Sequence, residues 1–193
     1  STTIIQLVDA AGKLSKNKRG ALIVVDLGSD LRPEDFLYSG TNIEAQLSTD
    51  LLINLFATDT PLHDGAVLVK GNKIISAGVI LPLSRQGISR YGTRHLAALG
   101  ITERFDRCIC IVVSEETGTL SLANQGKLER PITSSRLQEL LENLIGNQNS
   151  MGNSKSTLSK NAISHKTNSN DNIISDINEK ESIKSESFSN IKD

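Results

Sequence analysis

The chain has 193 residues, of which 21 are Lys or Arg and 22 are Asp or Glu, so its formal net charge is −1 at pH 7. This length suits one domain, alone or with an appendage, and the balanced charge excludes a bulk field that would attract nucleic acid or an acidic membrane. Aromatic residues make up 3% of the chain and tryptophan is absent, so a stacking surface for single strands is not expected either. We therefore expect no nucleic-acid partner.

Two further observations bear on the compartment. No stretch approaches the roughly 20 apolar residues that are needed to cross a bilayer, and the first residues lack the order of a signal peptide. Cys108 and Cys110 lie two residues apart in an apolar run, where a strand would turn both to one face as small buried side chains. We therefore expect a protein of the reducing cytoplasm.

The first part of the chain predicts a helix, a strand and a second helix. Residues 2–20 carry apolar side chains at helical spacing and end in basic residues and glycine, a pattern typical of a helix. The run "ALIVVDLG" (21–28) is short and continuously apolar, which is typical of a strand covered on both sides. The segment 48–57, "STDLLINLFA", begins with Ser and Thr, which favour the start of a helix.

The next part predicts two strand pairs and two helices. Residues 65–81 favour two strands joined by a tight Gly-Asn turn, and a short helix is expected over 92–101. A second pair of strands is expected at 108–114 and 118–126. Thr133 can cap a last helix, whose apolar residues recur at i, i+3, i+4, i+7 and i+8: Leu137, Leu140, Leu141, Leu144 and Ile145.

Strand pairs with helices before, between and after them indicate an α/β fold, or α+β in stricter usage. We expect a mixed, mostly antiparallel central sheet with helices on both faces. From residue 147 the composition shifts to Asn, Ser, Lys and isolated Ile without helical or strand period, and such a segment buries too little apolar surface to offset its ordering entropy. We expect a folded domain over 1–146 and a disordered tail over 147–193, in which His165 has no role.

Three polar clusters lie at the ends of expected elements: "HDG" at 63–65, "GTRH" at 92–95 and "SEETG" at 114–118. Each has a plain structural interpretation as a turn or a helix cap. The functional interpretation is that Asp64 accepts a proton or holds a divalent cation and that Gly65 lets the backbone approach a ligand. The amides, hydroxyl and guanidinium of the second cluster would bind phosphate. The chain contains no P-loop, dinucleotide fingerprint, nucleophile elbow or zincin motif that would compete.

In chain order, the segments "PLHDGAVLVKGNKI", "LPLS", "GTRHLAALGI" and "IVVSEETG" closely resemble the catalytic domain of the diadenylate cyclases, most of all the membrane-associated type. The similarity covers most of 1–146. It implies an enzyme that joins two ATP molecules into the second messenger cyclic di-AMP, releasing two pyrophosphates with the help of Mg²⁺ or Mn²⁺. It also implies a homodimer with one ATP in each domain, because a two-fold interface would present each 3′-hydroxyl to the opposite α-phosphate.

The resemblance also assigns roles to residues. Asp64, followed by Gly65 and Ala66, matches the family's acidic motif and would assist deprotonation of the 3′-hydroxyl, directly or through the metal, and His63 would help to ligate that metal. Leu81 matches a position whose backbone holds adenine, and Glu116 one that contacts phosphate and metal. The remaining positions of the triphosphate site are matched by Thr93, Arg94, His95 and Ser114.

The chain departs from the family at Leu96, where the second motif usually ends in Arg. Loss of a charge-assisted phosphate contact costs about 1.5–3 kcal/mol, which is roughly ten- to a hundredfold in affinity or rate. Arg85 and Arg90 in the preceding loop are candidates for compensation. Two alternatives stay open: a catalytically weakened sensor that binds ATP or a cyclic dinucleotide, and an interaction module whose tail recruits partners.

The resemblance bears on partners and location as well. It implies a regulatory protein partner. Many family members carry membrane helices ahead of this domain, so it also implies a cytoplasmic chain that is the soluble part of an anchored protein, with the N-terminal anchor absent here.

Overall fold

The structure is a computed structural model that describes residues 1–157, with side chains described through residue 146. Within this range a seven-stranded sheet has the order β2-β4-β3-β1-β5-β6-β7. Its strands are β1 (Ala21–Asp26), β2 (Thr41–Gln46), β3 (Ala66–Lys70), β4 (Lys73–Val79), β5 (Cys108–Val113), β6 (Leu120–Asn124) and β7 (Lys127–Ile132). Among these described strands β1 and β3 pair in parallel, whereas the other neighbours are antiparallel.

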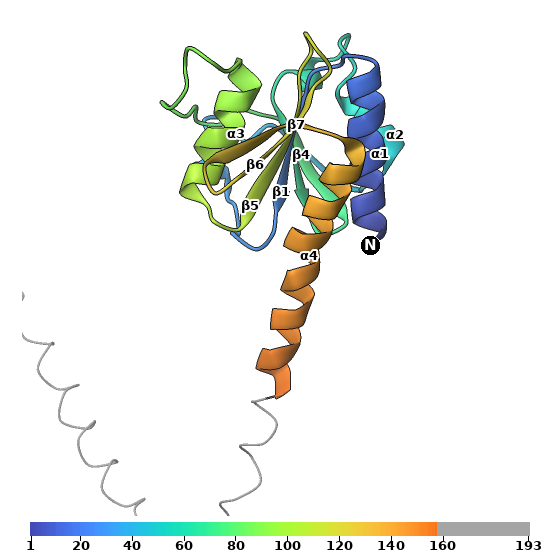
Figure 1. Cartoon of the computed structure of the whole chain (residues 1–193), viewed down its shortest axis with the longest axis vertical. Coiled ribbons are helices and arrows are strands. Elements are labelled where there is room, and N and C mark those ends of the chain that lie inside the picture. The colour runs from blue at the N-terminus through green and yellow to red at the C-terminus, as the bar shows by residue number, and fades with distance from the viewer. Residues whose placement is uncertain (158–193) are drawn as a thin grey trace, which may run out of the picture. The chain divides into compact units, whose positions relative to one another are not determined.

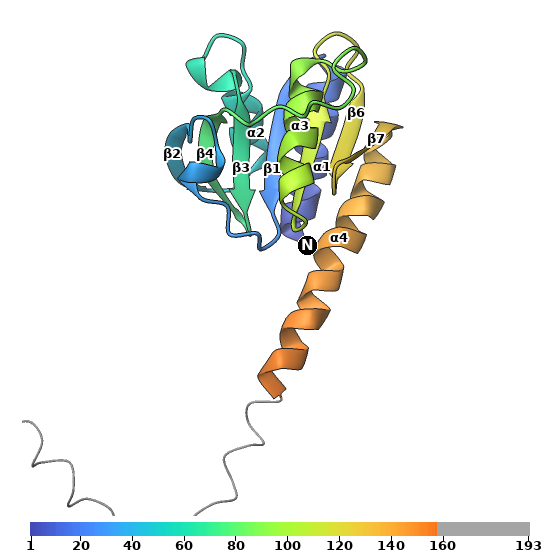
Figure 2. The same ribbon diagram turned by 90° about the vertical axis from the view of Figure 1, so that its left-hand side faces the viewer.

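Helices cover both faces of the sheet, as Figures 1 and 2 show. The helices are α1 (Thr2–Lys16), α2 (Thr49–Leu55), α3 (Thr93–Arg104) and α4 (Ser134–Thr157), with short 3-10 helices at η1 (Pro33–Asp35) and η2 (Pro61–His63). One apolar core packs beneath α1, α2 and the start of α4, and a second one packs beneath α3. The predicted α/β fold, a mixed and mostly antiparallel sheet with helices on both faces, is confirmed.

Local chemistry explains where the helices begin. Ser48 accepts a hydrogen bond from the Leu51 amide at 3.2 Å, at the start of α2. Thr133 accepts one from the Arg136 amide at 3.1 Å, which confirms the predicted cap of α4. A side-chain oxygen at such a position satisfies one of the amides that a helix start leaves without a partner.

The buried strands agree with the apolar runs of the sequence. All residues of β1 and β5 are buried, as expected for central strands covered on both faces. Cys108 and Cys110 on β5 are free thiols in the core beneath α3, and burial raises the pKa of the Cys110 thiol well above its usual value. They are small buried side chains, as predicted.

Two strands were not predicted from the sequence, and both lie at an edge of the sheet. The strand β2 alternates between exposed and half-buried residues, and β7 is mostly exposed and contains Pro131. An edge strand buries little and is held by pairing with its neighbour, so its sequence carries only a weak apolar pattern.

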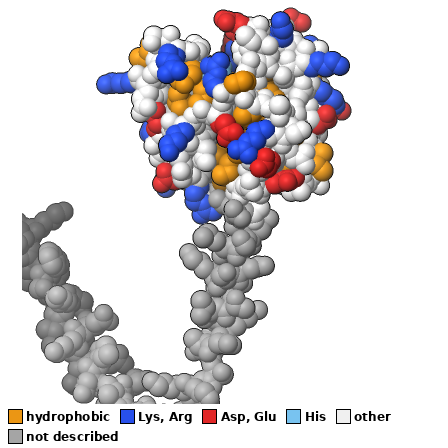
Figure 3. Space-filling view, viewed as in Figure 1, with side chains coloured by type: hydrophobic (Ala, Val, Ile, Leu, Met, Phe, Trp, Pro, Cys, Tyr) orange, Lys and Arg blue, Asp and Glu red, His pale blue; other side chains and the backbone are white. Residues whose placement is uncertain are grey.

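One compact unit of the chain spans Ser1–Gly152, and α4 continues to Thr157, past the predicted domain boundary at residue 146. Most of the predicted tail, with His165, lies outside the described residues, so the division into domain and tail stays a prediction. No described helix has both the length and the apolar character that a bilayer crossing requires. On the face of the molecule in Figure 3, basic and acidic side chains are interspersed.

Candidate functional site

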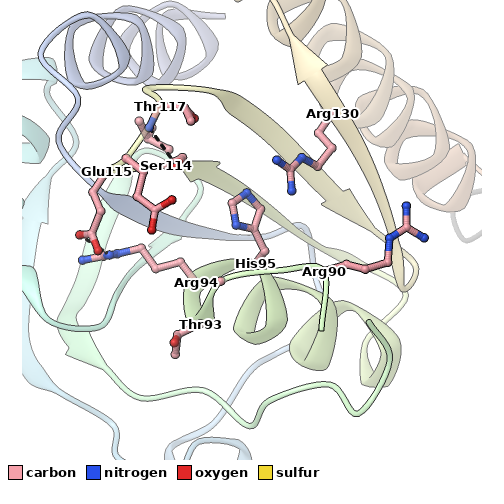
Figure 4. Close-up of a pocket in the computed structure, with 11 residues that line it drawn as sticks. Arg90, Thr93, Arg94, His95, Ser114, Glu115, Thr117 and Arg130 are labelled. Atoms are coloured by element: carbon pink, nitrogen blue, oxygen red, sulfur yellow. Dashed lines mark hydrogen bonds and ion pairs between the residues drawn. The ribbon is translucent and has the colours of Figure 1, made fainter. Parts of the chain in front are cut away.

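Two adjoining pockets lie at one end of the sheet, near the starts of β1 and β3 and the ends of β4 and β5. The first, of about 260 Å³, is polar and is lined by the start of α3, the loop after β5 and the strand β7 (Figure 4). The second, of about 240 Å³, is mainly apolar and lies between β4, α3 and the segment that follows β4. Thr93 and Arg94 line both pockets and form their junction.

The polar pocket owes its character to the start of α3. Gly92 precedes the helix with extended backbone, and the first turn contains no acidic residue. The first amides of a helix have no intrahelical partner and carry a partial positive charge. Arg94 and Arg130 add guanidinium groups to this pocket, and Glu115 and Glu116 add carboxylates. Arg90 also lines the pocket, but its guanidinium is directed away from His95 (Figure 4). Such a pocket suits an anion that bears several oxygen atoms.

Arg94 is held in place by Glu115. Its Nη1 donates to Glu115 Oε2 at 2.8 Å, whereas its Nε is buried and has no hydrogen-bond partner among the described residues. Gly20 lies beneath this pair, and a Cβ at that position would lie 2.8 Å from Arg94 Nη1. The bare backbone at Gly20 therefore leaves the space in which the guanidinium lies.

His95 is a buried side chain of the polar pocket. It is 6% exposed, and its Nε2 lies 3.2 Å from the Ser121 hydroxyl. Burial is the main cause that lowers the pKa of His95 below its usual value, and the positive charge of Arg130 lowers it further. Its predicted part in a triphosphate site stays a prediction.

Leu96 lines neither pocket and is 8% exposed. Of the two loop arginines that were candidates to replace the missing cation, Arg90 lines the polar pocket, whereas Arg85 lines neither pocket.

Asp64 stands at the rim of the apolar pocket, and its side chain is 78% exposed. Its Oδ1 lies 3.3 Å from His63 Nε2, and His63 Nδ1 is in turn 2.5 Å from the carbonyl oxygen of Thr60. The ring of His63 is thus oriented toward Asp64 by the turn that η2 forms. His63 itself lines neither pocket.

Gly65 follows Asp64 with φ +122°, and a Cβ there would lie 2.7 Å from the carbonyl carbon of Gly78. The sequence predicted that this glycine lets the backbone approach a ligand. Gly65 does line the apolar pocket, but the space left by its missing side chain is filled by the backbone of β4. Ala66 is fully buried in β3 behind it. The two residues therefore fix the start of β3, which directly follows Asp64.

The remaining predicted residues divide between the two pockets. Leu81, 3% exposed, lines the apolar pocket. Ser114 and Glu116 line the polar one, and the Ser114 hydroxyl accepts a hydrogen bond from the Thr117 amide at 3.4 Å (Figure 4). Sequence reasoning missed Arg130, because it lies on an unpredicted edge strand and belongs to no motif.

The predicted metal ligands are not gathered into one cluster. His63 and Asp64 lie together, whereas Glu116 lines the other pocket. Within the described part of the chain, no three His, Cys, Asp or Glu side chains are grouped as a metal site would group them.

A polar pocket that adjoins an apolar one suits a phosphorylated ligand with an apolar end. Over residues 8–128 the chain matches the family described as the nucleotide-binding domain of the DisA bacterial checkpoint controller, abbreviated DAC. The chain therefore belongs to the DAC family, as the resemblance in its motifs implied.

Named relatives agree with this assignment. Cyclic di-AMP synthase CdaA of Bacillus subtilis is 42% identical over 142 residues, which are 72% of this chain and 51% of that protein. A diadenylate cyclase of Listeria monocytogenes is 47% identical over 130 residues, or 66% of this chain and 46% of that one. The chain thus spans about half the length of these curated relatives.

Solved structures share the fold as well. A crystal structure of a DacA double mutant from Staphylococcus aureus has a TM-score of 0.68 at 37% identity, covering 75% of this chain and 95% of that one. A hypothetical membrane spanning protein from Bacillus cereus has a TM-score of 0.62 at 43% identity, covering 67% and 63%.

Proposed function

We propose that the chain is a diadenylate cyclase, which condenses two ATP molecules into cyclic di-AMP and two pyrophosphates. The observation that carries this proposal is the junction of an apolar and a polar pocket at Thr93 and Arg94, with the carboxylate of Asp64 at the rim. The names of the relatives, a cyclic di-AMP synthase and a diadenylate cyclase, support the same activity.

The two pockets would divide one ATP molecule between them. Adenine suits the apolar pocket, where the buried Leu81 offers its backbone to the edge of the base. The triphosphate would pass the junction at Thr93 and Arg94 and enter the polar pocket. There the first amides of α3 and the guanidinium groups complement its charge.

The reaction forms two phosphodiester bonds. In each, a 3′-hydroxyl oxygen of one ATP attacks the α-phosphorus of the other, and the bond from that phosphorus to the pyrophosphate oxygen breaks. The hydroxyl proton passes to Asp64. This residue lies at the rim of the apolar pocket, where the ribose of a bound nucleotide would lie. Because the same exchange occurs twice, the ring closes and two pyrophosphates leave.

A second copy of the chain would supply the second ATP. Asp64 is largely exposed, so it can face a nucleotide that another copy holds. Next to the apolar pocket lies an exposed apolar surface, the apolar rim, in which the backbones of Tyr38 and Ile80 pair. The rim consists of Leu37, Tyr38, Ile80 and Leu83. Exposed apolar side chains at the mouth of a pocket favour contact with another protein surface.

The donor set fits a divalent cation that is held partly by substrate. Mg²⁺ is commonly bound by one or two carboxylates together with phosphate oxygens and water, so a cluster of three protein ligands is not required. Asp64 and Glu116 offer carboxylates, and His63 offers an imidazole nitrogen suited to Mn²⁺. A bound cation would lower the pKa of the attacking hydroxyl and neutralise phosphate charge.

Product analysis tests the proposal. The intact chain incubated with ATP and Mn²⁺ is expected to yield cyclic di-AMP, and Asp64→Asn is expected to lower the rate by about a hundredfold or more while ATP still binds. Equal output from both proteins would refute the role of Asp64. ATP binding without any product from the unaltered chain would instead favour the catalytically weakened sensor.

A further inference from the structure

We propose that Arg130 binds the β- and γ-phosphates of ATP, an assignment that rests on the proposed function and extends its site to β7. Arg130 lines the polar pocket. In Figure 4 its guanidinium points from β7 toward the space beside His95, whereas the side chain of Arg94 extends away from Arg130 toward Glu115. No motif of the sequence marks this residue.

Arg130 lies on the same face of β7 as Leu128, which packs against the core beneath α3, because side chains alternate along a strand. The same alternation separates Arg130 from its acidic neighbour Glu129, which lies on the opposite face of the sheet. Glu129 accepts a hydrogen bond from Arg136 Nε of α4 at 2.8 Å, on the face of the sheet away from α3. Among the residues whose side chains are described, no carboxylate forms an ion pair with Arg130. No described carboxylate therefore neutralises its charge.

An aromatic ring holds the guanidinium in place. The central carbon of Arg130 lies 5.6 Å from the centre of the Tyr91 ring, and that of Arg90 lies 5.8 Å from the same ring. A cation–π contact orients a guanidinium without using its N–H groups. Arg130 therefore presents free donors to the pocket, whereas Arg94 already shares Nη1 with Glu115.

The position of Arg130 selects the phosphates that it contacts. Arg94 and Thr93 line both pockets, so the α-phosphate would lie at their junction. Arg130 lines only the polar pocket, and it would therefore meet the phosphates farther from the sugar. Leu96 contributes no cation and lines neither pocket, so Arg130 supplies a charge that the second motif lacks.

Binding measurements on the full chain test the assignment. The probes are AMP, ADP and α,β-methylene-ATP, which keeps three phosphates but resists loss of pyrophosphate. For Arg130→Ala we expect affinity for the ATP analogue to fall about ten- to a hundredfold, affinity for ADP to fall less, and affinity for AMP to stay nearly unchanged. Arg130→Lys should recover part of the loss, because it keeps the charge but not the forked donor.

Lys127→Ala is the matched control, since it removes a cation from the same strand outside the pockets, and it should bind all three nucleotides like the unaltered chain. Equal unfolding midpoints exclude a general loss of structure. If the unaltered chain binds the ATP analogue and Arg130→Ala binds it equally well, the inference is wrong while the proposed function stands. If the unaltered chain binds none of the three nucleotides, both are overturned.

Discussion

At the scale of single residues, Glu115 takes up one of the N–H donors with which Arg94 would bind a phosphate. Its carboxylate accepts from Arg94 at 2.8 Å and its side chain is 63% exposed. A substrate phosphate that binds Arg94 Nη1 must displace Glu115, and an ion pair with a largely exposed partner is weak. We expect Glu115→Gln to tighten binding of α,β-methylene-ATP by about two- to fivefold, measured by calorimetric titration.

The control for this prediction is Glu129→Gln, which removes a carboxylate that pairs with Arg136 away from the pockets. It should leave nucleotide affinity unchanged. Weaker rather than tighter binding by Glu115→Gln would mean that Glu115 itself assists the bound nucleotide, for example through a cation.

His95 predicts a dependence of stability on pH. Burial and the nearby Arg130 lower its pKa in the folded protein below the usual 6.5, so the unfolded chain takes up a proton more readily than the folded one. The contribution of His95 to stability is therefore fully present above pH 6.5, the pKa of the unfolded chain, and is lost as the pH falls toward the lower pKa of the folded protein. From pH 7.5 to 5.5 we expect the free energy of unfolding to decrease, with at most about 1.4 kcal/mol per pH unit from this one proton.

Urea unfolding of the unaltered chain and of His95→Gln at several pH values isolates the contribution of His95 to the pH dependence of stability. Gln keeps a polar group that can reach Ser121 but does not titrate, so its stability should vary less over the same range. Identical pH dependence in the two proteins would contradict the assignment of this proton to His95.

At the scale of elements, the packing of α3 against the segment after β4 sets the distance between the walls of the apolar pocket. Gly100 of α3 lies so close that a Cβ would be 2.1 Å from the carbonyl oxygen of Pro82. The Ser84 amide also donates to the Leu96 carbonyl at 2.9 Å. We expect Gly100→Ala to push the two elements apart, lowering stability by about 1–3 kcal/mol and raising KM for ATP.

Gly146→Ala is the matched control, because that glycine is also helical and a Cβ there would meet nothing within 4 Å. It should keep KM and, through higher helix propensity, gain up to about 1 kcal/mol of stability. The prediction for Gly100 fails if both variants unfold at the same urea concentration.

The sequence predicted those elements whose burial leaves a strong apolar pattern. Continuous runs predicted β1 and β5, and the spacing from Leu137 to Ile145 together with Thr133 predicted α4 and its start. The edge strands β2 and β7 were missed because their stability comes from pairing rather than from apolar residues of their own. The sequence of an edge strand does not indicate which strand it pairs with.

The candidate site shows the same division. The clusters around Asp64, Thr93 and Ser114 could be found because each is a short polar interruption at the end of an apolar element. Which pocket each cluster lines depends on the order of strands in the sheet. Arg130 depends in addition on β7, whose place at the edge of the sheet arises from pairing with β6 rather than from its own segment.

At the scale of the whole molecule, the proposed reaction needs two copies of the chain. A copy that lacks Asp64 should therefore impair a normal copy with which it pairs, because the ring needs both phosphodiester bonds. At protein concentrations where specific activity has reached its plateau, a tenfold excess of Asp64→Asn should reduce the turnover of the unaltered chain by about tenfold through mass action. Cyclic di-AMP formed per unaltered chain is the measured quantity.

A second substitution in the inactive chain tests whether the two copies meet at the apolar rim. Leu37 is 71% exposed and lines neither pocket, so Leu37→Glu should fold normally, yet a charge buried without a partner opposes pairing. Excess chain carrying both Asp64→Asn and Leu37→Glu should then leave turnover intact. Equal inhibition by both inactive chains would place the contact elsewhere, and no inhibition by either would mean that one copy completes the ring alone.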